Sequence, residues 1–159
     1  MSKSLKRVIT ALRGAGLEIE PVETGDETRT AAQAAAAVGC LLDQIAKSII
    51  FRGADSGAVH LFVTAGGNRV DPGLAQQVAG EALDAADAAF VRARTGFVIG
   101  GVSPVGHLTP GPVYFDPRLT EFAEIWAAAG TPRHVFRIAP TRLIEISGAQ
   151  VSDFTTKLK

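Results

Sequence analysis

The chain has 159 residues, of which 47% are hydrophobic and 20% are charged. This length and composition predict a single globular domain over residues 1–159 and exclude global disorder. Sixteen Lys and Arg balance sixteen Asp and Glu, so the net charge is zero, which argues against a protein that coats long stretches of nucleic acid. A local basic pocket is still compatible with this balance.

Several other classes of protein can be set aside. Cys40 is the only cysteine, which leaves no intramolecular disulfide and no cysteine-based metal site. No apolar run approaches the ~20 residues that span a bilayer, and no hydrophobic leader follows the first residues. No histidine cluster or HExxH motif indicates a metal. We therefore expect a cytoplasmic protein, away from membranes, that uses no metal and no cofactor.

Periodicity and turn residues predict the elements of the chain. Helices are expected, in chain order, at 4–16, 28–39, 68–80, 84–96 and 139–148. Strands are expected at 17–22, 43–53, 57–67, 111–116 and 149–154. The second and third of these strands should form an antiparallel hairpin. Because strands and helices are interspersed without strict βαβ alternation, we predict a mixed-sheet α/β or α+β domain.

One segment is ambiguous from its periodicity. Residues 119–130 place apolar side chains at helical spacing, whereas residues 124–138 also fit a hairpin about Gly130. Both readings stay open on the pattern alone.

Lys47 stands out within the predicted strand 43–53. Alternation along a strand puts its ammonium on the same face as Ile45, Ile49 and Phe51. An unpaired charge in a dry site is costly. Lys47 therefore either reaches water from the end of the strand or points into a cavity that receives an anion.

The segment TGFVIGGVSPVGH, residues 95–107, breaks every periodic pattern. Gly100 and Gly101 allow a ligand to approach backbone N–H groups closely, and Pro104 stiffens the end of the loop. Such a loop can hold an oxyanion or a phosphate, although it can also be a plain glycine turn between strands. It matches neither a dinucleotide fingerprint nor a P-loop.

Conventional catalytic groups are scarce. His60 and His134 fit structural or solvated roles, whereas His107 lies beside the glycine loop and is the stronger candidate for the site. Ser103 does not lie in a GxSxG elbow, and Cys40 fits a small buried hydrophobe. An enzyme built on this chain would rely on backbone donors, one lysine and water.

Together, the alanine-rich helix leading into DQIAKSIIF, the strand ending FVTAGGNRVD and the loop TGFVIGGVSPVGH resemble the YbaK/EbsC family of aminoacyl-tRNA deacylases. This family is related to the editing domain inserted in bacterial prolyl-tRNA synthetases, and the likeness covers roughly residues 4–155. The resemblance implies a mixed, strongly curved sheet surrounded by helices. It also implies that 124–138 is a hairpin.

The resemblance further implies the roles of individual residues. The functional lysine of the family falls on Lys47, where it would hold the phosphate near the 3′ end of the tRNA. The Gly-x-x-x-Pro motif falls on Gly100, Gly101, Val102, Ser103 and Pro104, whose backbone would line the aminoacyl pocket and contact the carbonyl. We expect Ile49, Phe51, Val98 and His107 to complete this pocket, whose apolar lining favours alanine-sized or 2-aminobutyrate-like side chains.

The implied activity is hydrolysis of the ester that joins a wrong small amino acid, such as Ala, Ser, Thr or Cys, to a tRNA, most often that for proline. The expected partner is the acceptor end of an aminoacyl-tRNA, with or without a prolyl-tRNA synthetase, bound by a monomer or weak homodimer. Candidate tRNA contacts are Arg52, Arg69, Arg92, Arg94 and Arg133. Two alternatives remain open, namely a non-catalytic module that binds a nucleotide or RNA 3′ end, and a hydrolase of another small activated ester.

Overall fold

A mixed eight-stranded sheet forms the centre of the computed structural model, which describes residues 2–156. The strand order is β1-β7-β6-β2-β3-β5-β8, and β4 pairs separately with β2. The strands are β1 (Val22–Glu23), β2 (Ile45–Gly53), β3 (Val59–Ala65), β4 (Leu83–Ala85), β5 (Val113–Phe115), β6 (Ile125–Ala128), β7 (His134–Ile138) and β8 (Gln150–Val151). Because β2 is parallel to β6 but antiparallel to β3, the prediction of a mixed sheet is confirmed.

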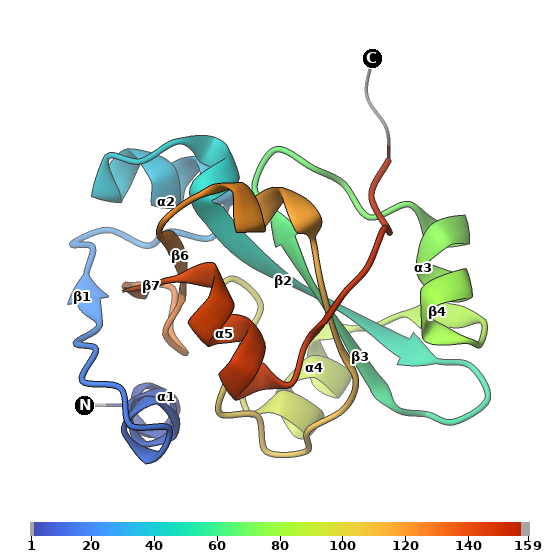
Figure 1. The fold of residues 1–159 in the computed structure, drawn as a ribbon. Coiled ribbons are helices and arrows are strands. Elements are labelled where there is room, and N and C mark those ends of the chain that lie inside the picture. The colour runs from blue at the N-terminus through green and yellow to red at the C-terminus, as the bar shows by residue number, and fades with distance from the viewer. Residues whose placement is uncertain (1, 157–159) are drawn as a thin grey trace.

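Helices lie around this sheet (Figure 1). They are α1 (Lys3–Gly14), α2 (Ala31–Val38), α3 (Pro72–Ala79), α4 (Ala88–Thr95) and α5 (Pro140–Ser147), with short 3-10 turns η1 (Leu42–Gln44) and η2 (Pro117–Glu121). All five predicted helices are present. Thr30, Asp71 and Asp87 each accept a backbone N–H in the first turn of the helix that follows, as good N-cap residues do.

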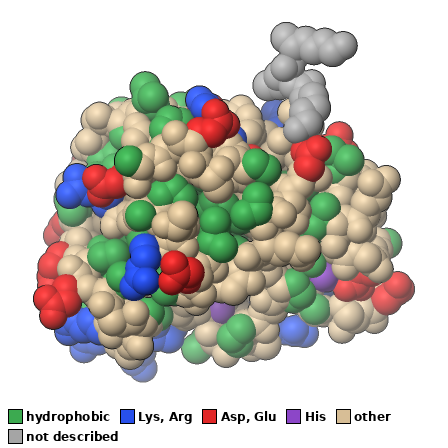
Figure 2. Space-filling view, viewed as in Figure 1, with side chains coloured by type: hydrophobic (Ala, Val, Ile, Leu, Met, Phe, Trp, Pro, Cys, Tyr) green, Lys and Arg blue, Asp and Glu red, His purple; other side chains and the backbone are tan. Residues whose placement is uncertain are grey.

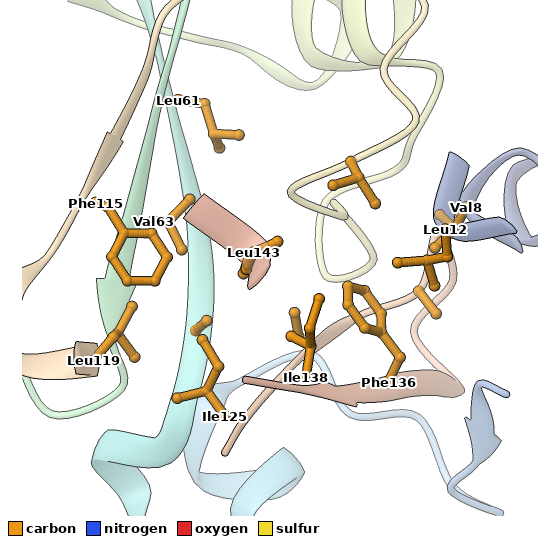
Figure 3. Packing of buried hydrophobic residues seen from close by; sticks show 14 of the residues in the cluster. Val8, Leu12, Leu61, Val63, Phe115, Leu119, Ile125, Phe136, Ile138 and Leu143 are labelled. Carbon is orange, nitrogen blue, oxygen red and sulfur yellow. The ribbon is translucent and has the colours of Figure 1, made fainter. Parts of the chain in front are cut away.

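The main core lies between α1, α5 and one face of the sheet. Its buried residues include Leu12 of α1, Phe136 of β7 and Leu143 of α5, none of which is exposed to solvent. In Figure 3, Val8 and Leu12 lie across from Phe136 and Ile138. Burial of this kind stabilises by about 25 cal/mol per Å² of apolar surface, which fixes the sheet against the helices.

Three local expectations needed correction or refinement, and the hairpin implied for residues 124–138 is confirmed. The predicted strand 17–22 is reduced to β1, since Pro21 cannot donate to a ladder. Residues 84–96 begin with β4 and become helical only after the Asp87 cap. Residues 124–138 form the hairpin of β6 and β7, so the helical reading of 119–130 is wrong. The last strand is limited to β8.

The edge of β2 is paired only in part. β6 pairs with Ile45 and Ala46, and β4 pairs with Phe51–Gly53. Between them, residues 47–50 have no partner strand on this side within the described chain. The sheet therefore has an opening four residues long in the middle of its longest strand.

None of the helices among residues 2–156 combines the length and apolar character needed to cross a membrane.

Candidate functional site

A cavity of about 350 Å³ lies at the opening along β2. This volume is within the usual range for small-molecule sites. Its walls come from β2, β6, β7, the start of α2, α4 and the glycine loop. Its lining residues include Arg29, Lys47, Ser48, Ile49, Gly100 and Val102. Four predicted site residues, Lys47, Ile49, Gly100 and Val102, are therefore brought together around one cavity.

Backbone N–H groups of β2 face this opening. Gly53 donates to the Ala58 carbonyl across the hairpin (2.9 Å), and in an antiparallel ladder every second residue faces the partner strand in this way. Lys47 and Ile49 are thus bonded to β3, whereas the N–H groups of Ser48 and Ile50 point toward the unpaired edge. The site therefore offers fixed amide donors that belong to a strand.

Lys47 is half-buried at the cavity wall. Its Nζ donates to the Gly66 carbonyl oxygen at 3.2 Å, and no carboxylate within residues 2–156 forms an ion pair with it. Burial lowers the pKa of Lys47, as does the charge of Arg69, while Asp116 and Asp43 raise it. An ammonium with one neutral acceptor can still donate to an anion.

The two glycines of the loop have different surroundings. Gly100 lines the cavity with φ of +94°, a conformation that favours glycine. The N–H of Gly101 already donates to the Val98 carbonyl at 2.9 Å, and a Cβ there would lie 2.7 Å from the Thr131 carbonyl carbon. Gly101 therefore does not line the cavity, and it allows the loop to pack on the turn between β6 and β7.

Arg29 fixes the glycine loop from the opposite side. Its Nη1 donates to the Ile99 carbonyl at 3.0 Å, and its Nε pairs with Glu27 at 2.9 Å. A Cβ on Gly100 would lie 3.0 Å from the Arg29 Cγ. The loop thus lies between Arg29 and the β6–β7 turn and forms one wall of the cavity.

Three expected pocket residues lie elsewhere. Phe51 is beyond the opening, where β2 pairs with β4, and packs edge-on against Phe62 with ring centres 5.6 Å apart. Val98 is 41% exposed and does not line the cavity. Ser103 is fully buried, and its Oγ accepts the N–H of Val105 at 3.2 Å.

Pro104 and His107 line a second cavity of about 250 Å³. The Nε2 of His107 donates to the Ser103 carbonyl at 2.6 Å, and its ring packs edge-on against Phe97. Burial lowers the pKa of His107, against the hydrogen bond to Ser103, which raises it, and Arg7 lowers it further. In this position His107 braces the loop from behind and does not reach the first cavity.

The lining of the first cavity limits its chemistry. Arg29 and Lys47 are its charged residues, and no Asp, Glu, His or Cys is among the described residues that line it. Within residues 2–156, no group of three His, Cys, Asp or Glu side chains is placed to hold a metal ion. The site is therefore suited to binding an anionic ligand through cations and backbone amides.

Ser48, Arg29 and Trp126 are lining residues that sequence reasoning missed. The Oγ of Ser48 is buried and has no hydrogen-bond partner among the described residues. Its position directly after Lys47 is the one signal that could have identified it. Arg29 and Trp126 carry no local signal, because they reach the cavity only through the pairing of distant segments.

Comparison with known proteins gives consistent results. The family model described as aminoacyl-tRNA editing domain matches residues 26–146. The uncharacterized protein YwhH of Bacillus subtilis (strain 168) is 33% identical over 148 residues, which cover 93% of this chain and 94% of the relative.

Two solved structures are very similar. One, described as a proposed trans-editing enzyme for prolyl tRNA synthetase, has a TM-score of 0.92 and 46% identity, with 99% of each chain covered. The other comes from work on grafting epitopes onto scaffold proteins by computational design, with a TM-score of 0.93, 45% identity and coverage of 99% of this chain and 100% of that chain. Because the family model matches more than half of the length of this chain, the chain belongs to the aminoacyl-tRNA editing domain family.

Proposed function

We propose that this protein is a trans-editing deacylase that hydrolyses the ester of a mischarged small amino acid on tRNA, with tRNA(Pro) as the carrier. The observation that carries the proposal is that one cavity combines the wall at Gly100 with Lys47, which is half-buried and forms no ion pair with a carboxylate within residues 2–156. Family membership and the similarity to a proposed trans-editing enzyme for prolyl tRNA synthetase support it.

In the proposed complex, Lys47 binds the phosphate near the 3′ end of the tRNA. A compact ammonium suits a phosphate oxygen, and Lys47 has N–H donors left after its bond to Gly66. The unpaired amides of Ser48 and Ile50 and the backbone at Gly100 then surround the ester carbonyl. Fixed donors of this kind stabilise an oxyanion without having to reorganise.

The chemical step needs little from the side chains. Water attacks the carbonyl carbon, the bond to the ribose oxygen breaks, and one water proton ends on that oxygen. Because no Asp, Glu, His or Cys is among the described residues lining the cavity, and Lys47 is assigned to the phosphate, we give the assisting role to the neighbouring ribose hydroxyl. An aminoacyl ester is already activated, so positioning and oxyanion binding can be sufficient.

The walls of the cavity favour a small, apolar amino acid. Ala31, Ala34, Ala127 and Ala128 contribute methyl groups, and Val102 closes another side. We propose alanine or a 2-aminobutyrate-like residue as the preferred group. A second site that admits only smaller side chains removes errors that a synthetase pocket cannot reject.

Recognition of the tRNA should be confined mostly to its acceptor end. On the face shown in Figure 2, basic side chains lie beside acidic ones at several places, consistent with the zero net charge. Such a surface gives little long-range attraction for a polyanion. We propose a cytoplasmic monomer or weak homodimer that gains affinity from a prolyl-tRNA synthetase when one is present.

The test is deacylation of tRNA(Pro) charged separately with alanine, serine, cysteine and proline. The variants are Lys47→Ala and, as a matched control for the loss of one positive charge, exposed Lys6→Ala. We expect rapid loss of a small mischarged residue, a spared prolyl ester, much slower deacylation by Lys47→Ala and an unchanged rate for Lys6→Ala.

Two results would replace the proposal. Equal rates on a minimal aminoacyl ester without tRNA would identify a hydrolase of other activated esters. Tight binding of the acceptor end without any hydrolysis would identify a non-catalytic binding module.

A further inference from the structure

The carbonyl oxygen that accepts from the Lys47 ammonium belongs to a turn that is hydrogen-bonded to two carboxylates. Gly66 follows β3, and the turn is closed by the Asn68 N–H, which donates to the Ala65 carbonyl at 2.9 Å. The residues on either side of Gly66, Ala65 and Gly67, each donate a backbone N–H to a carboxylate. The position of the Lys47 partner is therefore set by acidic side chains outside the cavity.

Asp116 holds the side of the turn that precedes Gly66. Its Oδ2 accepts the backbone N–H of Ala65 at 3.0 Å and the side-chain Nδ2 of Asn68 at 2.9 Å. The carboxylate is only 2% exposed. Hydrogen bonds to a buried charged acceptor are among the stronger ones, so this anchor should be rigid.

Asp43 holds the side that follows Gly66. Its Oδ1 accepts the Gly67 N–H at 2.7 Å, and η1, which contains Asp43, lies directly against the turn. A Cβ on Gly66 would overlap the Leu42 carbonyl oxygen, and one on Gly67 would overlap Asp43 Oδ1. The absence of side chains at both glycines is what permits this close approach.

Arg118 joins the two carboxylates. Its Nε donates to Asp43 Oδ2 at 3.0 Å, and its backbone N–H donates to Asp116 Oδ1 at 2.9 Å. The hydrogen bond to Asp43 raises the pKa of Arg118. The network thus runs from Arg118 through two carboxylates to the turn and ends at Lys47.

We propose that Asp43 and Asp116 are positioning residues for Lys47, acting through the Gly66–Gly67 turn to hold its ammonium toward the anion site without pairing with it. Asp43 precedes Lys47 by four residues, yet its contact is with the amide of Gly67. A direct ion pair would occupy the donors that the phosphate needs. The indirect route supplies negative charge nearby and leaves those donors free. This inference deepens the proposed function and rests on it for the identity of the anion.

The experiment compares Asp43→Ala with Asp43→Asn, because the amide can still accept from Gly67 but carries no charge. Glu121→Gln is the matched control, since Glu121 also pairs with Arg118 (2.9 Å) but does not touch the turn. We expect kcat/KM for deacylation to fall about 10- to 100-fold in Asp43→Ala, the scale of a misplaced binding group, with partial rescue in Asp43→Asn. Glu121→Gln should retain the wild-type value.

A second readout needs no catalytic activity. The chain has five lysines, so the Lys47 signal can be followed by NMR with labelled lysine and assigned from its loss in Lys47→Arg. Since Asp43 raises the pKa of Lys47, both Asp43 variants should titrate Lys47 at lower pH than wild type. A folded Asp116→Asn variant should likewise titrate Lys47 at lower pH. The two Asp43 variants test the proposal even when Asp116→Asn does not fold, because Asp43 is less buried than Asp116.

The outcomes separate the two proposals. A wild-type Lys47 titration together with wild-type kcat/KM in Asp43→Ala would overturn the positioning role. A wild-type protein that deacylates none of the esters would end the proposed function, while the titration would still decide whether the network controls Lys47.

Discussion

The ammonium nitrogen of Lys47 lies 3.2 Å from the carbonyl oxygen of Gly66, and that neutral oxygen is its hydrogen-bond acceptor within residues 2–156. A half-buried cation held in this way costs the free protein stability, because burial disfavours the charge and no carboxylate of the described residues contacts it to compensate. Groups that cost stability in the free protein are often retained because a ligand needs them.

Lys47→Met should therefore separate stability from activity. The methionine keeps the apolar stem and removes the charge, so we expect an unchanged or higher melting temperature. Loss of a charge-assisted hydrogen bond to phosphate should raise KM by about 10- to 100-fold. Thermal unfolding and steady-state deacylation measure the two effects. A large drop in melting temperature would instead make Lys47 a structural residue.

Ser48→Ala should also be at least as stable as the wild type, but for a different reason. The Ser48 hydroxyl is buried without a partner among residues 2–156, and a buried unpaired polar group costs about 1–3 kcal/mol. Removing it should raise the free energy of unfolding by about 1 kcal/mol, and lower kcat/KM if the hydroxyl is reserved for substrate. Urea unfolding provides the measurement. The control is Ser147→Ala, whose hydroxyl donates to Leu143 at 2.6 Å and whose loss should destabilise.

Gly101→Ala should damage the site through packing. The added methyl group would lie 2.7–2.8 Å from backbone atoms of Thr131, which cannot move as easily as a side chain. We expect a loss of about 1–3 kcal/mol in stability and a displaced Gly100 wall with reduced activity. Gly14→Ala is the control, because a Cβ there meets nothing within 4 Å. Wild-type stability of Gly101→Ala would show that the loop adjusts freely.

Acid should lower the stability of the protein through Glu81, which binds the turn between β2 and β3. Its carboxylate accepts from the Ser56 side chain and backbone, from His60 and from Asp55, and these bonds lower the pKa of Glu81 to about 2 from 4.5. A lowered carboxyl pKa stabilises the fold above pH 4.5, and this contribution is lost as the pH falls from 4.5 toward 2.

The stability difference between wild type and Glu81→Gln should accordingly be largest at neutral pH and shrink across that acid range. Urea unfolding at a series of pH values measures it, with exposed Glu145→Gln as the control carboxylate. A difference that stays constant from pH 7 to pH 3 would contradict the assignment.

Local signals predicted much of the fold. Thr30 and Asp71 cap the helices that the sequence indicated, and the β2–β3 hairpin forms over the expected residues. Both depend on neighbours close in the chain. The opening beside Lys47 could not be predicted, because it depends on where β6 stops and β4 begins along β2, and those strands come from distant segments.

The residues that line the candidate cavity divide in the same way between local and distant signals. Lys47 and Gly100 were recognisable because a cation in an apolar strand and a glycine-rich loop are local anomalies. Pro104 and His107 share that loop, but the chain turns between Val102 and Pro104, and they face the second cavity. Arg29 was not recognisable, since its partner Ile99 is seventy residues away in the chain.

The opening in the sheet has a consequence for the exchange of amide hydrogens with solvent. Amides bonded to β3, such as those of Lys47 and Ile49, should exchange slowly, whereas those of Ser48 and Ile50 should exchange quickly although they belong to the same central strand. An occupant of the cavity that accepts from the free edge would slow only the second pair. Exchange along β2 would therefore report two properties separately. The amides of Lys47 and Ile49 report the stability of the fold, and those of Ser48 and Ile50 report the occupancy of the cavity.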